Sequence, residues 1–233
     1  MRPTLYLLPG LLCDARVWLH QQQNLNDLAD IRIPDFSQFD SLEAMADAVL
    51  SDAPAQFYVA GHSMGSRVAM MIVDKAPERV VKLALLNTGL HAARENEDSK
   101  RGALIAMAEH IGMDALARTW APPMVDEARV DDTAFMQTIF DMVADYSVDS
   151  FRKQINALLN RPDATASLQK APKGTLLLTG QQDRWSPLSQ HEEIARILSD
   201  HPAVVLIENS GHMAPMEQPN AVTAALRNWL EER

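Results

Sequence analysis

The residue of this chain with the most evident chemistry is a serine framed by two glycines. Residues 61–65 read Gly-His-Ser-Met-Gly, and they lie between an apolar run at 56–60 and a helical pattern that continues to residue 75. A serine in so sharp a strand-to-helix turn has a strained backbone, with its hydroxyl exposed above the sheet at the positive end of the helix. A glycine-rich turn with an incidental serine is the alternative. The setting favours the first interpretation and predicts that Ser63 is a nucleophile.

An acid and a histidine follow two later strands of the predicted sheet. Asp183 comes directly after the apolar run 175–179, and His212 comes shortly after the run 203–208. The carboxyl ends of parallel strands share one edge of a sheet, which is where ligands bind in open α/β sheets. A histidine oriented by a carboxylate can remove the proton of a serine hydroxyl. The sequence therefore predicts a catalytic triad of Ser63, Asp183 and His212.

The chain order serine, aspartate, histidine resembles that of the α/β-hydrolase superfamily. Three further stretches resemble this family, so that the resemblance covers nearly the whole chain: Pro-Gly-Leu at 9–11 after an apolar strand, Gly-x-x-Asp-x-x-x-Pro at 180–187, and Gly-His followed by two prolines at 211–219. The resemblance implies that His212 acts as general base and then as general acid, and that Asp183 orients it. It also implies that the backbone N–H groups of Leu11 and Met64 form an oxyanion hole.

Two features depart from the pattern of the family. The family usually has His-Gly where this chain has Pro9-Gly10, a change that keeps the N–H of Leu11 but alters how its loop is braced. The family also usually begins with two further strands, whereas only three residues precede the first apolar strand here. We therefore expect the N-terminal β-hairpin to be missing.

The remaining chain alternates between short apolar runs and amphipathic stretches, as a doubly wound α/β fold requires. The runs are nearly continuous in apolar residues, as expected of strands covered on both faces. The pattern predicts an α/β-hydrolase fold with an open, mainly parallel six-stranded sheet and helices on both faces. The predicted strands are 4–8, 31–34, 56–60, 80–86, 175–179 and 203–208, and the predicted helices between them are 16–28, 41–50, 63–75, 188–198 and 221–232.

One long segment contains no convincing strand. Between residues 87 and 173 only helical patterns occur, at 99–111, 114–120, 132–146 and 148–159. An insertion at this point resembles the cap that covers the active site of many α/β-hydrolases and sets substrate choice. We therefore assign residues 1–88 and 171–233 to the hydrolase core and residues 89–170 to a helical cap within the same domain.

The predicted cap is rich in apolar and unbranched side chains, which suits a pliable pocket for an acyl group. The packing of cap helices on one another explains most of these residues equally well. We expect Trp120, Met124 and Met142 of the cap, together with Trp185 of the acid loop, to line the pocket. Cys13 is expected to be a small buried hydrophobic residue rather than a reactive thiol.

Arg67 follows Ser63 by one helical turn, which places it close enough to contribute to a substrate pocket. A salt bridge on the flank of the helix is the simpler interpretation. The Ser-x-x-x-Arg spacing also resembles that of the menaquinone-pathway cyclohexadiene synthases, in which a triad drives an elimination and arginines hold substrate carboxylates. Arg94 and Arg101 could serve as further anchors of that kind, although the charged stretch 94–101 is more simply a solvated entrance to the cap.

Composition limits the classes of protein to which this chain can belong. With 233 residues, 47% of them hydrophobic, the chain can bury one large core. Its net charge of −10 disfavours nucleic acids and anionic membrane surfaces as partners. The chain has a single cysteine, its start shows no signal-peptide pattern, and it contains no long apolar run. We therefore expect a cytoplasmic protein. We expect it to be a monomer or a homodimer. Four histidines, at 20, 110, 191 and 201, are expected at the surface or at helix ends, and no metal or other cofactor is implied.

These residues predict a serine carboxylesterase that acts on a small-molecule ester, thioester or lactone with a small to medium apolar acyl group. The closest resemblance is to compact bacterial carboxylesterases of the pimeloyl-ester demethylating type and to enol-lactone hydrolases. An enzyme that uses the same triad for an elimination or for C–C bond cleavage is the first alternative. A ligand receptor without catalytic activity is a more distant one, because such a role gives no reason for all three triad residues.

Overall fold

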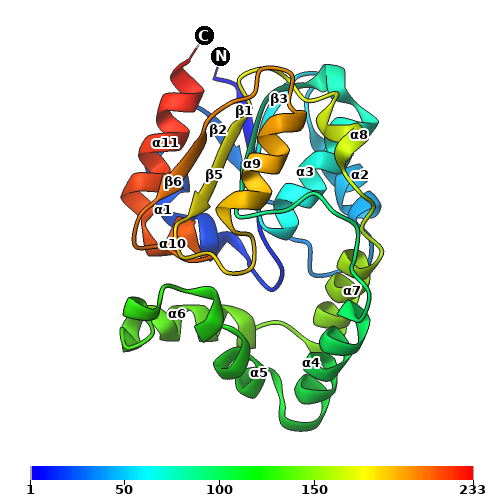
Figure 1. The fold of residues 1–233 in the computed structure, drawn as a ribbon, viewed down its shortest axis with the longest axis vertical. Helices are drawn as coiled ribbons and strands as arrows, with labels where there is room; N and C mark the ends of the chain where they lie inside the picture. Colours follow the sequence, from blue (N-terminus) through cyan, green and yellow to red (C-terminus); the bar gives the residue numbers. More distant parts are fainter. Residues whose placement is uncertain (1, 233) are drawn as a thin grey trace.

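A sheet of six parallel strands organises the molecule, which we describe from a computed structural model for residues 2–232 (Figure 1). The strand order is β2-β1-β3-β4-β5-β6, so the chain starts one strand in from an edge, adds β2 at that edge, and then crosses back over β1 to add the other four strands in order. The predicted parallel sheet is therefore confirmed, with strand ends within two residues of most of those expected. The strands are β1 (Thr4–Leu8), β2 (Asp30–Arg32), β3 (Phe57–His62), β4 (Val80–Leu86), β5 (Leu176–Gly180) and β6 (Val204–Ile207).

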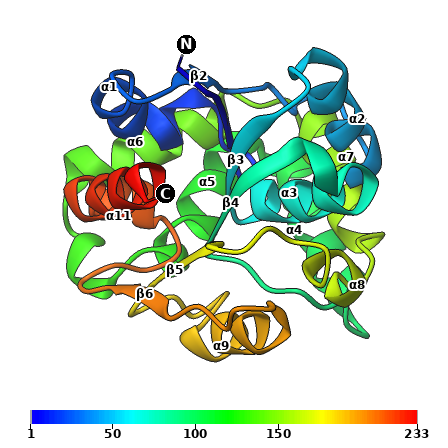
Figure 2. The ribbon, with the colours of Figure 1, turned by 90° about the horizontal axis from the view of Figure 1, so that it is seen from above.

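Helices cover both faces of the sheet, as a parallel sheet requires. Helices α1 (Leu19–Asn24) and α11 (Pro219–Glu231) pack together on one face, and α2 (Leu42–Asp52) packs with α3 (Met64–Lys75) on the other (Figure 2). The second face continues with α8 (Thr165–Leu168), which contacts α3 and α9 (Leu188–Ile197). The shorter elements are η1 (Ala15–Trp18), η2 (Pro77–Arg79) and α10 (Ala214–Glu217).

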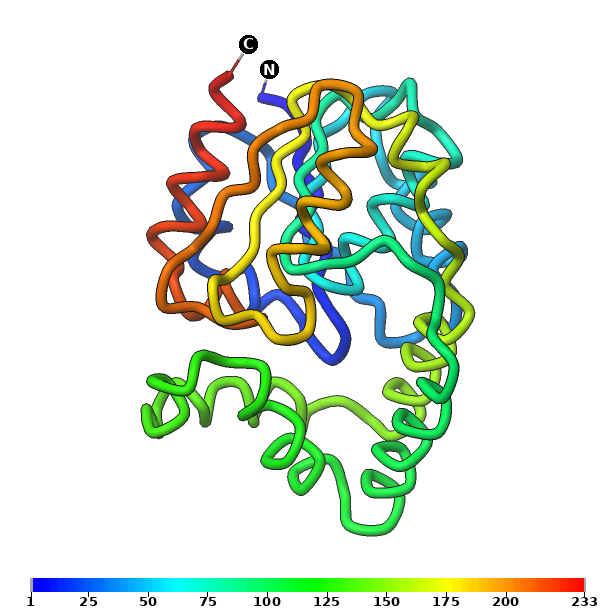
Figure 3. The backbone as a smooth tube through the Cα atoms, in the orientation of Figure 1, coloured from blue at the N-terminus to red at the C-terminus, as the bar shows by residue number. Residues whose placement is uncertain are grey.

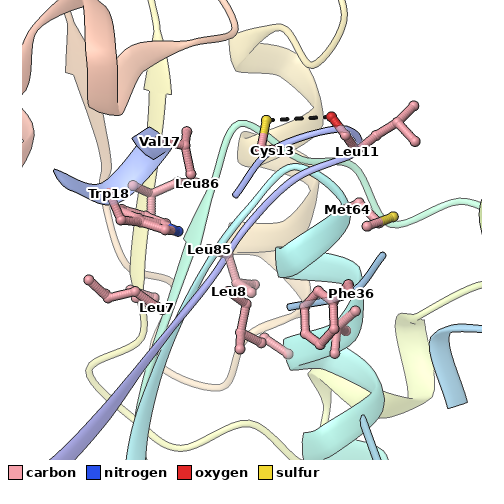
Figure 4. Packing of buried hydrophobic residues seen from close by; sticks show 14 of the residues in the cluster. Leu7, Leu8, Leu11, Cys13, Val17, Trp18, Phe36, Met64, Leu85 and Leu86 are labelled. Atoms are coloured by element: carbon pink, nitrogen blue, oxygen red, sulfur yellow. Dashed lines mark hydrogen bonds between the residues drawn. The ribbon is translucent and has the colours of Figure 1, made fainter. Parts of the chain in front are cut away.

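The core lies between these helices and the sheet. Leu7 and Leu8 of β1 point to opposite faces because side chains alternate along a strand, and both are fully buried. Leu7 lies near Trp18, whereas Leu8 lies near Phe36 on the side of α3 (Figure 4). Burial on both faces explains the nearly continuous apolar sequence of this strand. This packing also holds in place the carboxyl ends of the strands, from which the loops of the candidate site emerge.

Four helices, α4 to α7, form a separate layer beyond the carboxyl ends of the strands (Figures 1 and 3). Helix α4 packs against α5 and α7, and α5 packs against α6. These helices occupy the stretch in which the sequence predicts only helical patterns, and we call them the α4–α7 segment. They are α4 (Glu97–Ile111), α5 (Met113–Trp120), α6 (Thr133–Ala144) and α7 (Val148–Leu159), with η3 (Pro122–Met124) and η4 (Glu127–Arg129) between α5 and α6.

Two connecting stretches join the α4–α7 segment to the rest of the molecule. The outgoing stretch follows β4 and the returning stretch precedes α8, and the N–H of Ala164 donates to the carbonyl of Leu90 over 2.9 Å. The short helix α8 that follows the returning stretch packs on α3. Among residues 2–232, no helix combines the length and the apolar character needed to cross a bilayer.

Candidate active site

Ser63 lies in a sharp turn between β3 and α3. Its backbone has φ 55° and ψ −115°, a conformation that L-residues rarely adopt. The turn is possible because its flanks are glycines: a Cβ on Gly65 would lie 2.1 Å from the carbonyl oxygen of Leu8, and a Cβ on Gly61 would lie 2.4 Å from the backbone of the next helix. The glycine spacing that singled out the serine therefore has a direct steric cause.

His212 lies between this serine and a buried aspartate. Its Nε2 is 2.8 Å from Ser63 Oγ, and its Nδ1 is 2.9 Å from Asp183 Oδ2. A carboxylate can only accept hydrogen bonds, so Nδ1 donates to it and Nε2 of the neutral ring is the acceptor for the serine hydroxyl. Both His212 and Asp183 are buried. The structure thus brings the three residues of the predicted triad into one chain of hydrogen bonds.

Asp183 has donors on both carboxylate oxygens. Oδ1 accepts the N–H groups of Trp185 and Ser186, each at 2.9 Å, while Oδ2 accepts the Asn87 side chain at 2.9 Å in addition to His212. Burial raises the pKa of Asp183, but the adjacent His212 ring and these hydrogen bonds outweigh it and hold the pKa well below its ordinary value. The group is therefore a carboxylate at neutral pH.

Asn87 is a contributor that sequence reasoning missed. It directly follows β4, at the same edge of the sheet as Ser63 and His212. In the structure its Nδ2 donates to Asp183 Oδ2 and to the carbonyl of Gly211 at 3.2 Å. It therefore links the acid loop to the histidine loop. The sequence does hold one indication of this role, because Asn87 follows a strand whose carboxyl end lies at the same sheet edge as the triad.

Two backbone N–H groups next to Ser63 have no acceptor. Within residues 2–232, neither the N–H of Leu11 nor that of Met64, the first residue of α3, donates to a protein atom. Both residues line the same cavity as Ser63. Free N–H groups at the start of a helix attract negative charge, and the N–H of Met64 is such a group. The two N–H groups are therefore donors on the cavity wall that a bound anion could use.

The loop that contains Leu11 is braced by the α4–α7 segment. The N–H of Leu12 donates to Oε1 of Gln154 over 2.9 Å, and the hydroxyl of Tyr146 donates to the carbonyl of Cys13 over 2.8 Å. These contacts are long-range, and the sequence offered no sign of them. Cys13 is buried, as expected, and burial raises the pKa of its thiol to about 12 (Figure 4). A thiol with so high a pKa is a poor nucleophile at neutral pH.

His62 lies beneath the site, as its position in the turn suggests. Its Nε2 is 2.8 Å from the carbonyl oxygen of His212 and therefore donates to it. Burial lowers the pKa of His62 to about 3, so the ring is neutral at the pH at which most enzymes work. Its role is to support the histidine loop. His191, which was expected at the surface or at a helix end, lies in the first turn of α9 but is fully buried, and its Nε2 accepts the N–H of Thr88 over 3.1 Å.

Glu217 is a second contributor that the sequence did not reveal. It is 1% exposed, and its carboxylate accepts backbone N–H groups from three places: Gly211 at 2.9 Å, Met213 at 3.0 Å and Asp126 at 2.8 Å. Gly211 and Met213 flank His212, whereas Asp126 belongs to the α4–α7 segment. Burial raises the pKa of Glu217, and the three N–H groups oppose this shift. Glu217 therefore ties the histidine loop to that segment.

Ser63 opens into a cavity of about 350 Å³. Its apolar wall includes Trp120 and Met124, and Trp185 faces them from the acid loop. The rings of Trp120 and Trp185 meet edge to face at 5.6 Å, and Trp185 also lies 5.6 Å from the His212 ring. These three predicted pocket residues are therefore brought together. Met142 is not: it is fully buried on α6 among the helices of the α4–α7 segment, away from the cavity lining.

Arg67 also lines the cavity but forms none of the salt bridges expected on a helix flank. It is 6% exposed, and its guanidinium donates to the carbonyl of Gly89 at 2.7 Å and to that of Pro162. These carbonyls belong to the two stretches that connect the α4–α7 segment to the sheet. Burial lowers the pKa of Arg67 to about 10, which leaves the group charged at neutral pH. It is a buried cation without a carboxylate partner among residues 2–232.

A metal centre is not indicated by the side chains. Within residues 2–232, no three or more His, Cys, Asp or Glu side chains are arranged so that they could hold a metal ion.

Comparison with known proteins places this geometry in a family. The biotin biosynthesis bifunctional protein BioHC of Cellvibrio japonicus is 23% identical over 247 residues, which cover 99% of this chain but only 48% of that protein. A thermophilic esterase from Thermogutta terrifontis, solved with malate bound, is 27% identical with a TM-score of 0.89 over 98% of this chain and 89% of its own. The enol-lactonase from Burkholderia xenovorans LB400 shares the fold, with 19% identity and a TM-score of 0.85 over 100% of this chain and 92% of its own. The model of the alpha/beta hydrolase family matches residues 5–226, and the chain belongs to that family.

Proposed function

We propose that this protein is a serine hydrolase that cleaves a carboxylic ester, thioester or lactone through an acyl-enzyme. The observation that carries the proposal is the unbroken line of hydrogen bonds from Ser63 through His212 to Asp183, at 2.8 and 2.9 Å. It ends in a cavity large enough for a small ligand. The similarity to an esterase at 27% identity supports the same class of reaction.

In the first half of the reaction, Ser63 Oγ attacks the carbonyl carbon of the substrate while His212 Nε2 takes the hydroxyl proton. The carbonyl oxygen becomes an oxyanion, and the N–H groups of Leu11 and Met64 stabilise it, each by about 3 kcal/mol. Asp183 stabilises the imidazolium that forms. When the tetrahedral intermediate collapses, the bond to the leaving group breaks and His212 gives its proton to the departing alcohol or thiol.

In the second half, water repeats these steps in place of the serine. His212 takes a proton from the water, whose oxygen attacks the acyl carbon, and the same two N–H groups hold the new oxyanion. Collapse releases the acid and returns the proton to Ser63 Oγ. His212 and Asp183 are both buried, and burial strengthens the hydrogen bond between them.

The size of the cavity supports a small to medium acyl group. A volume of about 350 Å³ lies at the small end of ligand sites in proteins. Trp120 and Trp185 both line it, with their ring centroids 5.6 Å apart. A series of p-nitrophenyl esters is expected to give its highest kcat/KM with short acyl chains. A preference for chains longer than about twelve carbons would contradict this size limit.

The reaction class is tested with Ser63→Ala and a short p-nitrophenyl ester. Loss of the hydroxyl is expected to lower kcat by at least about 10³-fold, because only the oxyanion site and substrate binding remain. Ser51→Ala, which removes an exposed hydroxyl at the end of α2, serves as the matched control and is expected to keep wild-type turnover. Turnover at the wild-type rate by Ser63→Ala would rule out the proposed mechanism.

The elimination or C–C cleaving alternative has one observation in its favour. Arg67 is a buried cation beside the nucleophile, and such enzymes need cationic anchors for their substrates. They would use His212 to move a proton without forming an acyl-enzyme. Reaction of Ser63 with a phosphonate in an enzyme that turns over no ester, thioester or lactone would favour this alternative.

A further inference from the structure

The cavity beside Ser63 carries an excess of positive charge, although the whole chain has a net charge of −10. Its lining includes five lysine or arginine residues and two glutamates, a formal charge of +3. The cations are Arg67, Arg94, Lys100, Arg101 and Arg161, and the glutamates are Glu95 and Glu97. A cleft whose charge opposes that of the whole protein concentrates ligands of the opposite sign.

One carboxylate is shared between two of these arginines. Arg161 donates to both oxygens of Glu97, at 2.8 and 2.7 Å, and Arg101 donates to Oε1 over 2.8 Å. Burial raises the pKa of Glu97, but the hydrogen bonds from Arg161 and Arg101 outweigh it and lower the pKa to about 2. Glu97 is therefore charged, yet it balances only one of its two partners. The cluster keeps a positive charge on the cavity wall.

Two further cations are available to a ligand. Within residues 2–232, the side chains of Arg94 and Lys100 form no hydrogen bond and no ion pair. Both are exposed and both line the cavity. Lys100 lies in the first turn of α4 and Arg94 lies three residues before this helix begins; α4 has 15 residues, and its N-terminus adds positive potential.

A solvated protein surface does not explain this arrangement well. Cations near the N-terminus of a helix interact unfavourably with its dipole, so Lys100 and Arg101 do not stabilise α4 in that way. Two other exposed cations of the α4–α7 segment, Arg118 and Arg152, are ion-paired with acids of the same segment. Lys100 of this segment and the nearby Arg94 have no such partner among residues 2–232, and both line the cavity that contains the nucleophile.

We propose that the substrate carries a small carboxylate away from its scissile bond, which Arg94, Lys100 and the Arg101–Glu97–Arg161 cluster attract and hold. This inference rests on the proposed hydrolase function and names its substrate class: the half-ester of a short dicarboxylic acid, or a lactone with a carboxylate side chain. A cavity of about 350 Å³ has room for such a molecule. The expectation that residues 94–101 are only a solvated entrance, and that the acyl group is wholly apolar, is replaced by this proposal.

The test uses two series of methyl esters. The first series consists of the monomethyl esters of succinate, glutarate and adipate. The second series keeps the same methyl ester but has a neutral carboxamide in place of the free carboxylate. At low ionic strength we expect kcat/KM to be at least about tenfold higher for the best half-ester than for its amide. The ratio should fall as salt is added, because salt screens the attraction. In the double variant Arg94→Gln/Lys100→Gln the ratio should fall by about tenfold. The control Arg152→Gln removes an exposed cation of α7 that does not line the cavity, and it should leave the ratio unchanged.

Inhibition distinguishes a carboxylate site from a general anion site. Glutarate is expected to inhibit the hydrolysis of p-nitrophenyl acetate competitively and more strongly than inorganic phosphate does. Equal inhibition by phosphate would overturn the assignment to a carboxylate. Equal kcat/KM values for half-esters and amides, or an unchanged ratio in the double variant, would overturn the inference while the hydrolase proposal stands. If no ester of either series is cleaved in a Ser63-dependent way, the proposed function itself fails.

Discussion

The backbone N–H of His212 donates to the carbonyl oxygen of Met124 over 2.6 Å. This bond joins the candidate general base directly to the α4–α7 segment, in which Met124 also lines the cavity. A movement of that segment therefore moves the histidine as well as the pocket wall. Glu217 reinforces the connection, because its carboxylate accepts N–H groups from both sides of the same contact.

Glu217→Gln is expected to weaken this connection. The amide keeps one acceptor oxygen but turns a donor toward backbone N–H groups, which leaves buried donors unpaired. We expect a loss of about 1–3 kcal/mol in the free energy of unfolding, measured by urea denaturation. We also expect a lower kcat, because the loop that orients His212 is loosened. The control is Glu208→Gln, an exposed change in the preceding loop, which should alter neither the free energy of unfolding nor kcat. If Glu217→Gln matched wild type in both the free energy of unfolding and kcat, the role given to Glu217 would be refuted.

Asp183→Asn is expected to abolish most of the activity while the protein stays folded. The new amide can donate to Nδ1 of His212, which shifts the ring proton to Nε2, so that Nε2 can no longer accept the proton of Ser63. We expect kcat on a p-nitrophenyl ester to fall by about 10⁴-fold. The remaining oxygen can still accept the N–H groups of Trp185 and Ser186, and circular dichroism should therefore match wild type. Asp131→Asn, an exposed change, is the control, and near-full activity in Asp183→Asn would contradict the assigned role of the acid.

Glu97 is expected to make the stability of the protein depend on pH. Its pKa in the folded state is about 2, below the ordinary value of 4.5. Its contribution is therefore fully present above about pH 4.5 and is lost as the pH falls toward 2, because the unfolded chain takes up its proton first. The difference in unfolding free energy between wild type and Glu97→Gln should be larger at pH 6 than at pH 3. A difference that stays constant or grows on acidification would contradict the ion pairs described for Glu97.

Two glycine substitutions are expected to have opposite effects. In Gly65→Ala the new methyl group would lie 2.1 Å from the carbonyl of Leu8, so β1 and α3 must move apart. We expect a loss of at least about 3 kcal/mol or an insoluble protein. In Gly102→Ala the methyl group meets nothing within 4 Å in α4, and removal of a helical glycine should stabilise by about 0.5–1 kcal/mol. Thermal denaturation should give a lower Tm for Gly65→Ala and a higher Tm for Gly102→Ala than for wild type. A Gly65→Ala variant as stable as wild type would show that the turn is less tightly packed than described.

The sequence was sufficient for the features that depend on local patterns. Short apolar runs predicted the parallel strands because both faces of the sheet are covered. The glycines around Ser63 predicted the turn because no other residue fits so close to β1 and α3. The positions of Asp183 and His212 followed from the rule that strand ends share one edge.

The rest depends on contacts between residues far apart in the chain. Glu217 reads as an ordinary acid near a helix start, and only the fold shows that it is buried against Asp126, 91 residues away. Gln154 reaches the loop after β1 from a helix 142 residues away. The charged residues of the cavity wall come from two separate stretches of sequence. Only the folded structure shows that Arg161 forms an ion pair with Glu97.

The most direct test of the proposed mechanism is the reaction of the protein with a p-nitrophenyl alkylphosphonate. Ser63 Oγ is expected to attack phosphorus and form an O–P bond, while p-nitrophenolate leaves and His212 takes the serine proton. We expect one equivalent of p-nitrophenolate per chain, and peptide mapping should place the added mass on Ser63. Ser63→Ala should release none and gain no mass. Labelling of another residue, or release of p-nitrophenolate by Ser63→Ala at the wild-type rate, would contradict the assignment of Ser63 as the nucleophile.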